Sequence, residues 1–244
     1  MISEHVFIQR YTSFWQAALP MGNAVLRQIN RALKKKSTAW RFCREQKEHG
    51  GPIRRDLASE LGLRLLAAQA RDGQIDKERP SAARIEEAKR EALAFVQLQR
   101  GLDTPALPEP NALEIAEAGE ITRRLTAFLA RHEPTSPVTV LPTFPGCGIL
   151  AACQGDLLAG ETLYEMKASE EGFRVVDLRQ LLVYGALNFA SRGYAIRRFG
   201  LINPRLGVFF RANAEELVEV MAGRAAIDLF SDILDFLSTE RASA

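Results

Sequence analysis

The stretch GDLLAGETLYEMKAS, residues 155–169, places three charged side chains in an otherwise apolar segment. The Ala-Gly pair at its centre favours a turn, and the flanking residues are typical of two short strands. A two-residue loop would place Asp156 opposite Leu163, and a four-residue loop would place it opposite Glu165. In both registers side-chain alternation puts Asp156, Glu165 and Lys167 on one face. A three-residue loop without a bulge would turn Asp156 to the other face.

These charged groups need partners, because burying an unpaired charge is costly. One interpretation is a buried ion pair between Lys167 and either Asp156 or Glu165. The other is a Mg²⁺ or Mn²⁺ site, in which the two carboxylates are oxygen ligands and Lys167 points at a reacting water or phosphate. Neighbours across a strand pair stand roughly 4.5 to 8 Å apart, which is close enough for two carboxylates to share a cation.

The following segment, VVDLRQLLVYGALNFASRG (residues 175–193), has leucines at helical spacing. Asp177, Gln180 and Tyr184 are three and four residues apart, so they share one face of the expected helix. A glutamine or tyrosine at the edge of a core is usually structural. Here the same face would also bring hydrogen-bonding groups to the charged hairpin.

Three motifs occur in a fixed order: GD at 155–156, EMK at 165–167 and QLLVY at 180–184. This order resembles the PD-(D/E)XK nuclease superfamily, particularly its RecB-like branch, in which an aspartate, a Glu-x-Lys strand and a Gln-x-x-x-Tyr helix follow one another. The resemblance covers about the C-terminal half of the chain, from residue 112 onward, and does not extend to the first 100 residues.

The resemblance implies a metal site. Asp156, Glu165 and the backbone carbonyl of Met166 would bind one or two Mg²⁺ (or Mn²⁺) ions. The family often adds a glutamate from the helix before the sheet, for which Glu117 and Glu120 are the candidates. We favour Glu120, because it lies nearer the end of the helix that enters the strands.

The resemblance also implies an activity, the hydrolysis of phosphodiester bonds, most simply in DNA. Lys167 would position or deprotonate the attacking water and stabilise charge on the phosphate. Gln180 and Tyr184 would help to hold Lys167 or the DNA backbone. A lysine suits this role because its pKa falls when it is partly desolvated. By analogy of fold, DNA repair and phage defence are the processes in which such a nuclease would act.

The order of expected elements indicates an α/β fold, with a mixed β-sheet flanked by helices and a restriction-endonuclease-like core. A helix is expected at 112–132, strands between 136 and 169, a helix at 175–193, two strands around Asn203-Pro204, and two closing helices. Residues 1–102 have helical patterns throughout and are expected to form an all-helical, basic domain. Residues 103–111, which are rich in proline, would be the linker to a nuclease domain at 112–244.

Charge is unevenly distributed along the chain. Residues 1–100 contain 19 Lys and Arg against 11 Asp and Glu, although the whole chain has a net charge of only +2. A basic surface suits a nucleic acid, and the residues expected to contact phosphate are Lys34, Lys35, Lys36 and Arg41. An ordinary solvated helix surface explains the same pattern equally well.

Composition excludes several protein classes. No apolar run is long enough for a membrane span and the N-terminus does not resemble a signal peptide, so we expect a cytoplasmic protein with no membrane partner. Three cysteines are too few for the four-cysteine iron–sulfur cluster of some RecB-like nucleases.

An alternative function is a nuclease-fold subunit that mainly binds or scaffolds within a DNA-processing assembly. Its N-terminal or C-terminal helices would then contact a protein partner or a second copy of the chain.

Overall fold

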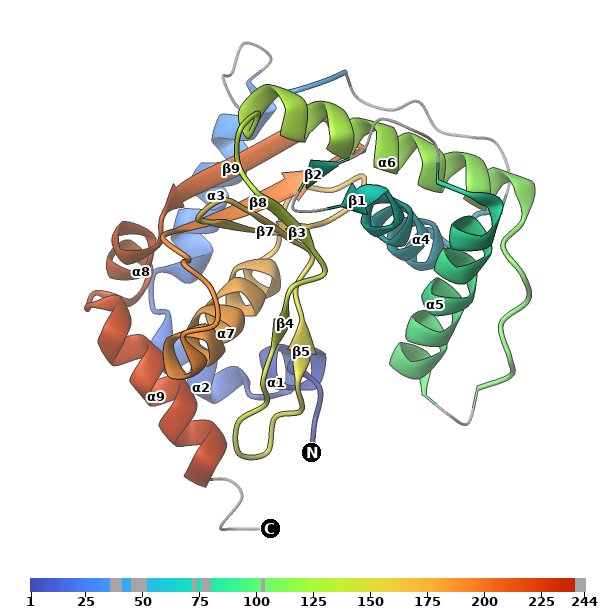
Figure 1. Ribbon diagram of the computed structural model, residues 1–244. Coiled ribbons are helices and arrows are strands. Elements are labelled where there is room, and N and C mark those ends of the chain that lie inside the picture. The colour runs from blue at the N-terminus through green and yellow to red at the C-terminus, as the bar shows by residue number, and fades with distance from the viewer. Residues whose placement is uncertain (36–40, 45–51, 72–73, 76–79, 102–103, 240–244) are drawn as a thin grey trace.

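A five-stranded mixed sheet lies at the centre of the protein, with helices on both faces (Figure 1). The computed structural model describes residues 1–35, 41–44, 52–71, 74–75, 80–101 and 104–239. The strand order is β3-β6-β7-β8-β9, in which β7 and β8 are parallel and the other pairs are antiparallel. The strands of this sheet are β3 (Val138–Val140), β6 (Leu157–Ala159), β7 (Thr162–Met166), β8 (Arg198–Asn203) and β9 (Val208–Asn213). The expected α/β class and mixed sheet are therefore confirmed.

The helices form two layers. One face of the sheet packs against α1 to α3 and α7 to α9, and the other face packs against α4 and α6. Helix α5 packs on α4 and α6, away from the sheet. None of the helices in the described part of the chain is both long and apolar enough to cross a membrane. The helices are α1 (Glu4–Arg10), α2 (Thr12–Ala18), α3 (Gly22–Lys34), α4 (Arg55–Gln69), α5 (Ala82–Arg100), α6 (Ala112–His132), α7 (Val175–Ser191), α8 (Ala214–Ala222) and α9 (Ala226–Thr239).

Side chains along β7 point alternately to the two faces of the sheet, and so to the two helix layers. Leu163 belongs to the core under α7, whereas Tyr164 and Met166 belong to the core under α6. Glu165 and Lys167 have the same parity as Leu163, so they are directed to the α7 side. Helix α7 connects β7 to the parallel strand β8, and its first turns therefore lie near the carboxyl end of β7, where ligands commonly bind in α/β sheets.

The described residues among the first 102 share their hydrophobic cores with the rest of the chain. Side chains of α1 to α3 share a hydrophobic core with α7, α8 and α9, and side chains of α4 and α5 share cores with α6. The boundary expected at residues 103–111 thus does not separate two hydrophobic cores in the described residues. The expectation of helices alone in this part was also wrong, because β1 (Ala70–Arg71) and β2 (Gln74–Ile75) form a small hairpin. A second small hairpin, β4 (Thr143–Phe144) with β5 (Cys153–Gln154), extends from the main sheet region.

Helix α4 is fixed to α6 by a buried ion pair at the start of both helices. Asn111 caps α6 and Glu114 completes the capping box, with the Glu114 Oε2 atom 2.9 Å from the Asn111 backbone nitrogen. The Arg54 side chain, just before α4, donates to both carboxylate oxygens of Glu114 at 2.7 Å. Burial acts to raise the pKa of Glu114, but the hydrogen bonds from Arg54 and Asn111 lower it to about 2.

Gly200 on β8 is expected to be intolerant of a side chain. A Cβ atom there would lie 2.3 Å from the ring of Tyr164, which is fully buried and donates a 2.8 Å hydrogen bond to Glu133. Gly200→Ala should lower the free energy of unfolding by about 1–3 kcal/mol, measured by urea denaturation. The matched control is Gly119→Ala on the exposed side of α6, where a Cβ meets nothing and removing a helix glycine should raise stability slightly. Equal stability of the two variants would contradict this packing.

Glu114→Gln is expected to destabilise the protein in a pH-dependent way. The pKa of Glu114 is about 2 in the folded protein and ordinarily 4.5, so its charge contributes stability above pH 4.5 that is lost as the pH falls towards 2. The difference in thermal midpoint between wild type and Glu114→Gln should therefore be largest near neutral pH and shrink below pH 4.5. Glu86→Gln, at the exposed pair with Lys89, should show little difference at any pH. A pH-independent loss in Glu114→Gln would contradict this reasoning.

Candidate active site

The β6–β7 hairpin brings Asp156 and Glu165 face to face. The paired residues are Leu157 with Tyr164 and Ala159 with Thr162, so extending the register by one residue places Asp156 opposite Glu165. The turn consists of Gly160 and Glu161 rather than Ala159 and Gly160, one residue later than expected. Gly160 has a φ of +56°, which a glycine adopts without strain. The structure therefore has the register of the four-residue alternative, closed by a tighter turn.

The two carboxylates are held close together in a buried setting. Asp156 Oδ2 accepts a 2.6 Å hydrogen bond from the backbone nitrogen of Met166, which fixes the aspartate against the end of β7. Glu165 is only 2% exposed. Burial raises the pKa of both carboxyl groups, and the charge of Asp156 raises that of Glu165 further. A positive charge close to these two carboxylates would therefore stabilise their ionised forms.

Lys167 supplies part of that charge. Its Nζ atom lies 2.7 Å from Glu165 Oε1, 3.1 Å from Gln180 Oε1 and 3.9 Å from Asp177 Oδ1. Burial alone would lower the pKa of Lys167, but the carboxylates of Glu165, Asp177 and Asp156 raise it above its ordinary value. The lowering of the pKa by desolvation that the sequence predicts is present, but the anionic neighbours outweigh it in this arrangement. Lys167 is therefore a cation beside these carboxylates.

Gln180 and Tyr184 form a hydrogen-bonded chain behind the lysine. Gln180 accepts from Lys167 and its Nε2 atom donates to the Tyr184 hydroxyl at 2.8 Å, which in turn donates to the backbone oxygen of Gln154 at 3.1 Å. The Tyr184 ring stacks on Phe144 with 5.1 Å between ring centroids. Burial raises the pKa of Tyr184, so its hydroxyl stays protonated and keeps donating. The structure thus brings the two helix residues to Lys167, as the spacing on α7 predicts.

Two carboxylate oxygens in the cluster lack a hydrogen-bond partner. Glu165 Oε2 and Asp177 Oδ1 are both buried and make no hydrogen bond within the described residues. An unpartnered buried anion is costly, and a hard cation coordinated by oxygen would satisfy it. No group of three or more His, Cys, Asp or Glu side chains in the described part of the chain is arranged as a ready metal cage. A cation bound here would therefore depend on two carboxylates, a backbone oxygen and water, as Mg²⁺ commonly does.

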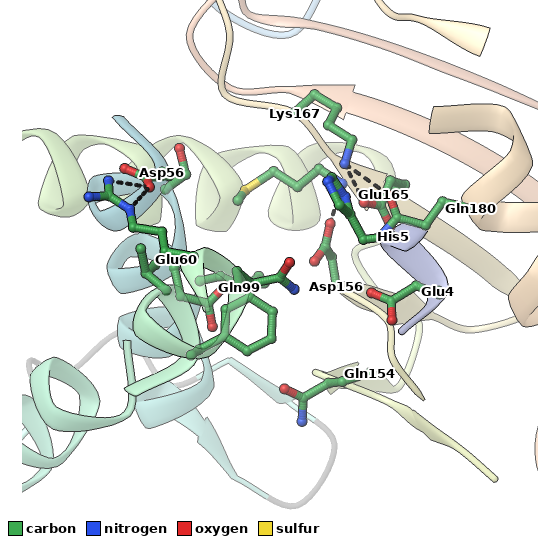
Figure 2. Close-up of a pocket in the computed structure, with 16 residues that line it drawn as sticks. Glu4, His5, Asp56, Glu60, Gln99, Gln154, Asp156, Glu165, Lys167 and Gln180 are labelled. Carbon is green, nitrogen blue, oxygen red and sulfur yellow. Dashed lines mark hydrogen bonds and ion pairs between the residues drawn. The ribbon is translucent and has the colours of Figure 1, made fainter. Parts of the chain in front are cut away.

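A cavity of about 350 Å³ opens in front of the cluster, between two walls (Figure 2). One wall carries Asp156, Glu165, Lys167 and Gln180, and the other wall is made by α4 and α5. A second cavity of about 560 Å³ lies on the other side of Lys167, along α4 and the segment between β7 and α7. Met166 and Lys167 line both cavities, together with Asp56 and Ser59 from α4, so the two cavities adjoin at the lysine.

Sequence reasoning missed several residues that line these cavities. Glu4 and His5 reach the first cavity from α1, and Figure 2 shows the Glu4 carboxylate pointing into it from the same side as Asp156. Burial raises the pKa of Glu4, and the charge of Asp156 adds to the effect. Glu60 lines the opposite wall from α4, and burial raises its pKa to about 7. No sequence signal links these residues to Asp156, because only the tertiary fold brings them together.

The structure does not bring the favoured glutamate of α6 to this cavity. Glu120 pairs with Arg123 and Arg124 at 2.6 Å, and these two hydrogen-bonding arginines lower its pKa to about 2. Glu117 is buried against Arg205 at 2.8 Å. Neither glutamate is among the residues that line the two cavities beside Lys167. Helix α6 lies on the other face of the sheet, which explains why its side chains meet a different set of partners.

The basic residues expected to contact phosphate are also away from these cavities. Lys34 and Lys35 are exposed at the end of α3, and neither lines them. Arg41 donates a 3.0 Å hydrogen bond to the backbone oxygen of Leu206, so it supports the turn between β8 and β9. Lys36 lies outside the described residues. Of this basic segment, the described residues Lys34, Lys35 and Arg41 therefore do not join the carboxylate cluster.

The cluster has the groups needed to hold a cation and to contact an anion beside it. The carboxylates of Asp156 and Glu165 attract a cation, whereas the Lys167 ammonium can stabilise negative charge that develops at the same place. No protein-family model, curated protein or solved structure matches this chain.

Proposed function

We propose that this protein is a metal-dependent nuclease that hydrolyses phosphodiester bonds, with DNA as its substrate. The observation that carries the proposal is the set of contacts around Lys167. The lysine is held between Glu165 and Gln180, and Gln180 donates in turn to the Tyr184 hydroxyl, which fits the motif order of the RecB-like nucleases that the sequence resembles. In this proposal the α6, β6–β7, α7 and β8 elements make up a restriction-endonuclease-like core.

Asp156, Glu165 and the backbone carbonyl of Met166 would hold Mg²⁺ or Mn²⁺. The unpartnered Glu165 Oε2 atom supports this assignment, and Glu4 and His5 line the same cavity from α1. A bound metal ion would supply an activated water and would neutralise charge on the phosphate. One or two ions are compatible with this set of oxygens.

The side chains around the metal site have separate roles. Lys167 remains charged, because its carboxylate neighbours raise its pKa, and it would bind a non-bridging phosphate oxygen as negative charge grows. Gln180 and Tyr184 fix the lysine through two hydrogen bonds in series. The buried position of Glu165 excludes water from its side of the site and strengthens each of these interactions.

A binding role within a larger DNA-processing assembly is the second candidate function. The complete set of Asp156, Glu165, Lys167, Gln180 and Tyr184 favours catalysis, since a subunit that only binds does not need them. Antiviral defence and DNA repair are processes in which such a nuclease would fit. The neighbouring genes would show in which of these processes it acts.

Hydrolysis should require both the carboxylates and the lysine. We expect the wild-type protein to cleave DNA with Mg²⁺ or Mn²⁺ and to lose this activity with EDTA. Asp156→Ala and Lys167→Ala should each lower the rate by about a hundredfold or more, because each removes a charge that stabilises the transition state. Plasmid, linear duplex and single-stranded DNA, together with RNA, are the substrates to compare by gel electrophoresis.

Glu161→Gln is the matched control for these variants, because Glu161 belongs to the exposed turn of the same hairpin and pairs with Arg197. It should cleave as the wild type does. Identical behaviour of wild type and Asp156→Ala on every substrate would reject the nuclease proposal. Activity that appears only after a partner protein is added would favour the assembly role.

Metal binding should also stabilise the fold. Mg²⁺ or Mn²⁺ at a hundredfold excess over Kd adds about 2.7 kcal/mol to the free energy of unfolding, which raises Tm. The increase should become larger as the pH rises, because protons compete with the metal for Asp156 and Glu165. Glu165→Gln should lose the increase and Glu161→Gln should keep it, as measured by differential scanning fluorimetry. An equal increase in both variants would mean that the ion binds elsewhere.

A further inference from the structure

The wall of the first cavity that faces the carboxylate cluster has an unusual charge pattern for a surface next to a phosphodiester. It carries Asp56 and Glu60 on α4, and each is already paired with an arginine. Arg100 Nη2 lies 2.6 Å from Asp56 Oδ2, and Arg64 Nε lies 2.8 Å from Glu60 Oε1. The described residues of this wall therefore offer no cation without a carboxylate partner, so the wall is poorly suited to a phosphate backbone.

The same wall offers an aromatic ring and an amide. Phe95 on α5 lines the cavity, and the Arg64 guanidinium lies over its ring at 5.7 Å from the centroid. Arg64 is itself fixed by Glu60, by Glu91 at 3.2 Å and by Gln154 at 3.0 Å. The ring is thus held in place by packing and by a positioned cation. An aromatic ring held in this way is a stacking platform of the kind that single-stranded nucleic-acid sites use.

Gln99 lies one helical turn after Phe95 on the same face of α5, and Figure 2 shows its amide directed across the cavity towards Asp156. An amide has two donors and one acceptor oxygen, so it can meet the hydrogen-bonding edge of any base. The cavity volume of about 350 Å³ is within the range of pockets that take small organic ligands.

We propose that the α4–α5 wall is a subsite for an unpaired nucleobase, which stacks on Phe95 while its phosphate lies at Lys167. This inference rests on the proposed function and specifies its substrate as a strand with unpaired bases. A paired base is already stacked inside the duplex and would present its phosphates, not its ring, to Asp56 and Glu60. Because both carboxylates are already paired with arginines, the described residues of the wall offer those phosphates no unpaired cation, so the geometry selects an unpaired nucleotide in DNA or RNA.

Binding measured without hydrolysis tests the subsite directly. Fluorescence anisotropy in EDTA, and separately with Ca²⁺, would compare a labelled single-stranded oligothymidylate, the corresponding oligouridylate, a fully paired duplex and an abasic strand of equal length. The wild type should bind the thymidylate roughly tenfold to a hundredfold more tightly than the abasic strand. The uridylate arm tells whether DNA, RNA or both are accepted.

Three variants of α5 separate stacking from packing. Phe95→Leu keeps an apolar side chain of similar size, and it should bind the thymidylate as weakly as the wild type binds the abasic strand. Phe95→Tyr should restore tight binding. Leu98→Ala, at a position that is 66% exposed on the same helix, should behave as the wild type. Circular dichroism melting of each variant would confirm that it is folded.

Equal binding of thymidylate by wild type and Phe95→Leu would overturn the subsite, as would an equal loss by Phe95→Leu on thymidylate and on the abasic strand. Tighter binding of the paired duplex than of the single strand would also overturn it. Failure of the proposed function looks different, since no substrate would be hydrolysed while Phe95-dependent binding persisted. Hydrolysis that does not depend on Phe95, together with Phe95-independent binding, would remove the subsite and leave the nuclease proposal standing.

Discussion

The ammonium group of Lys167 is the contact on which the site depends. Three carboxyl groups surround it, those of Glu165 at 2.7 Å, Asp177 at 3.9 Å and Asp156 on the adjoining strand. Burial raises the pKa values of Asp156 and Glu165, and the neighbouring carboxylates, which a single lysine does not balance, raise them further. A divalent cation would make up the difference in charge. The same imbalance that makes the site costly to fold therefore makes it suited to a metal.

The rest of the fold holds these carboxylates and Lys167 close together. The tight turn at Gly160 sets the register that puts Asp156 opposite Glu165, and alternation directs both to the α7 side of the sheet. Helix α7 then supplies Gln180 and Tyr184, one turn apart, to anchor the lysine. Each of these steps is local in sequence, within about thirty residues of chain. The second wall is not local, since α4 and α5 reach it only by packing on α6.

This difference explains which features could be predicted from the sequence. The mixed sheet, the hairpin and the shared face of Gln180 and Tyr184 follow from periods of two and of 3.6, which short segments display by themselves. The positions of Glu4 and Phe95 depend on how distant helices pack, and a single sequence contains no signal for that. The direction of the Lys167 pKa depends on the fold for a related reason. Burial alone lowers a lysine pKa, and the opposing effect of Asp177 depends on a distance that only the fold sets.

The net charge of a sequence segment also did not predict which surface lies beside the proposed catalytic residues. The basic first hundred residues suggested phosphate contacts, yet three of the described arginines there serve the fold. Arg54 is bound to Glu114, Arg64 to Glu60, and Arg41 to the backbone of Leu206. The cavity beside the proposed catalytic residues is instead rich in carboxylates. A polyanion can approach such a cavity only if something other than basic side chains offsets its charge. A metal ion at Asp156 and Glu165 would do so on one wall, and an aromatic contact that needs no charge would do so on the other.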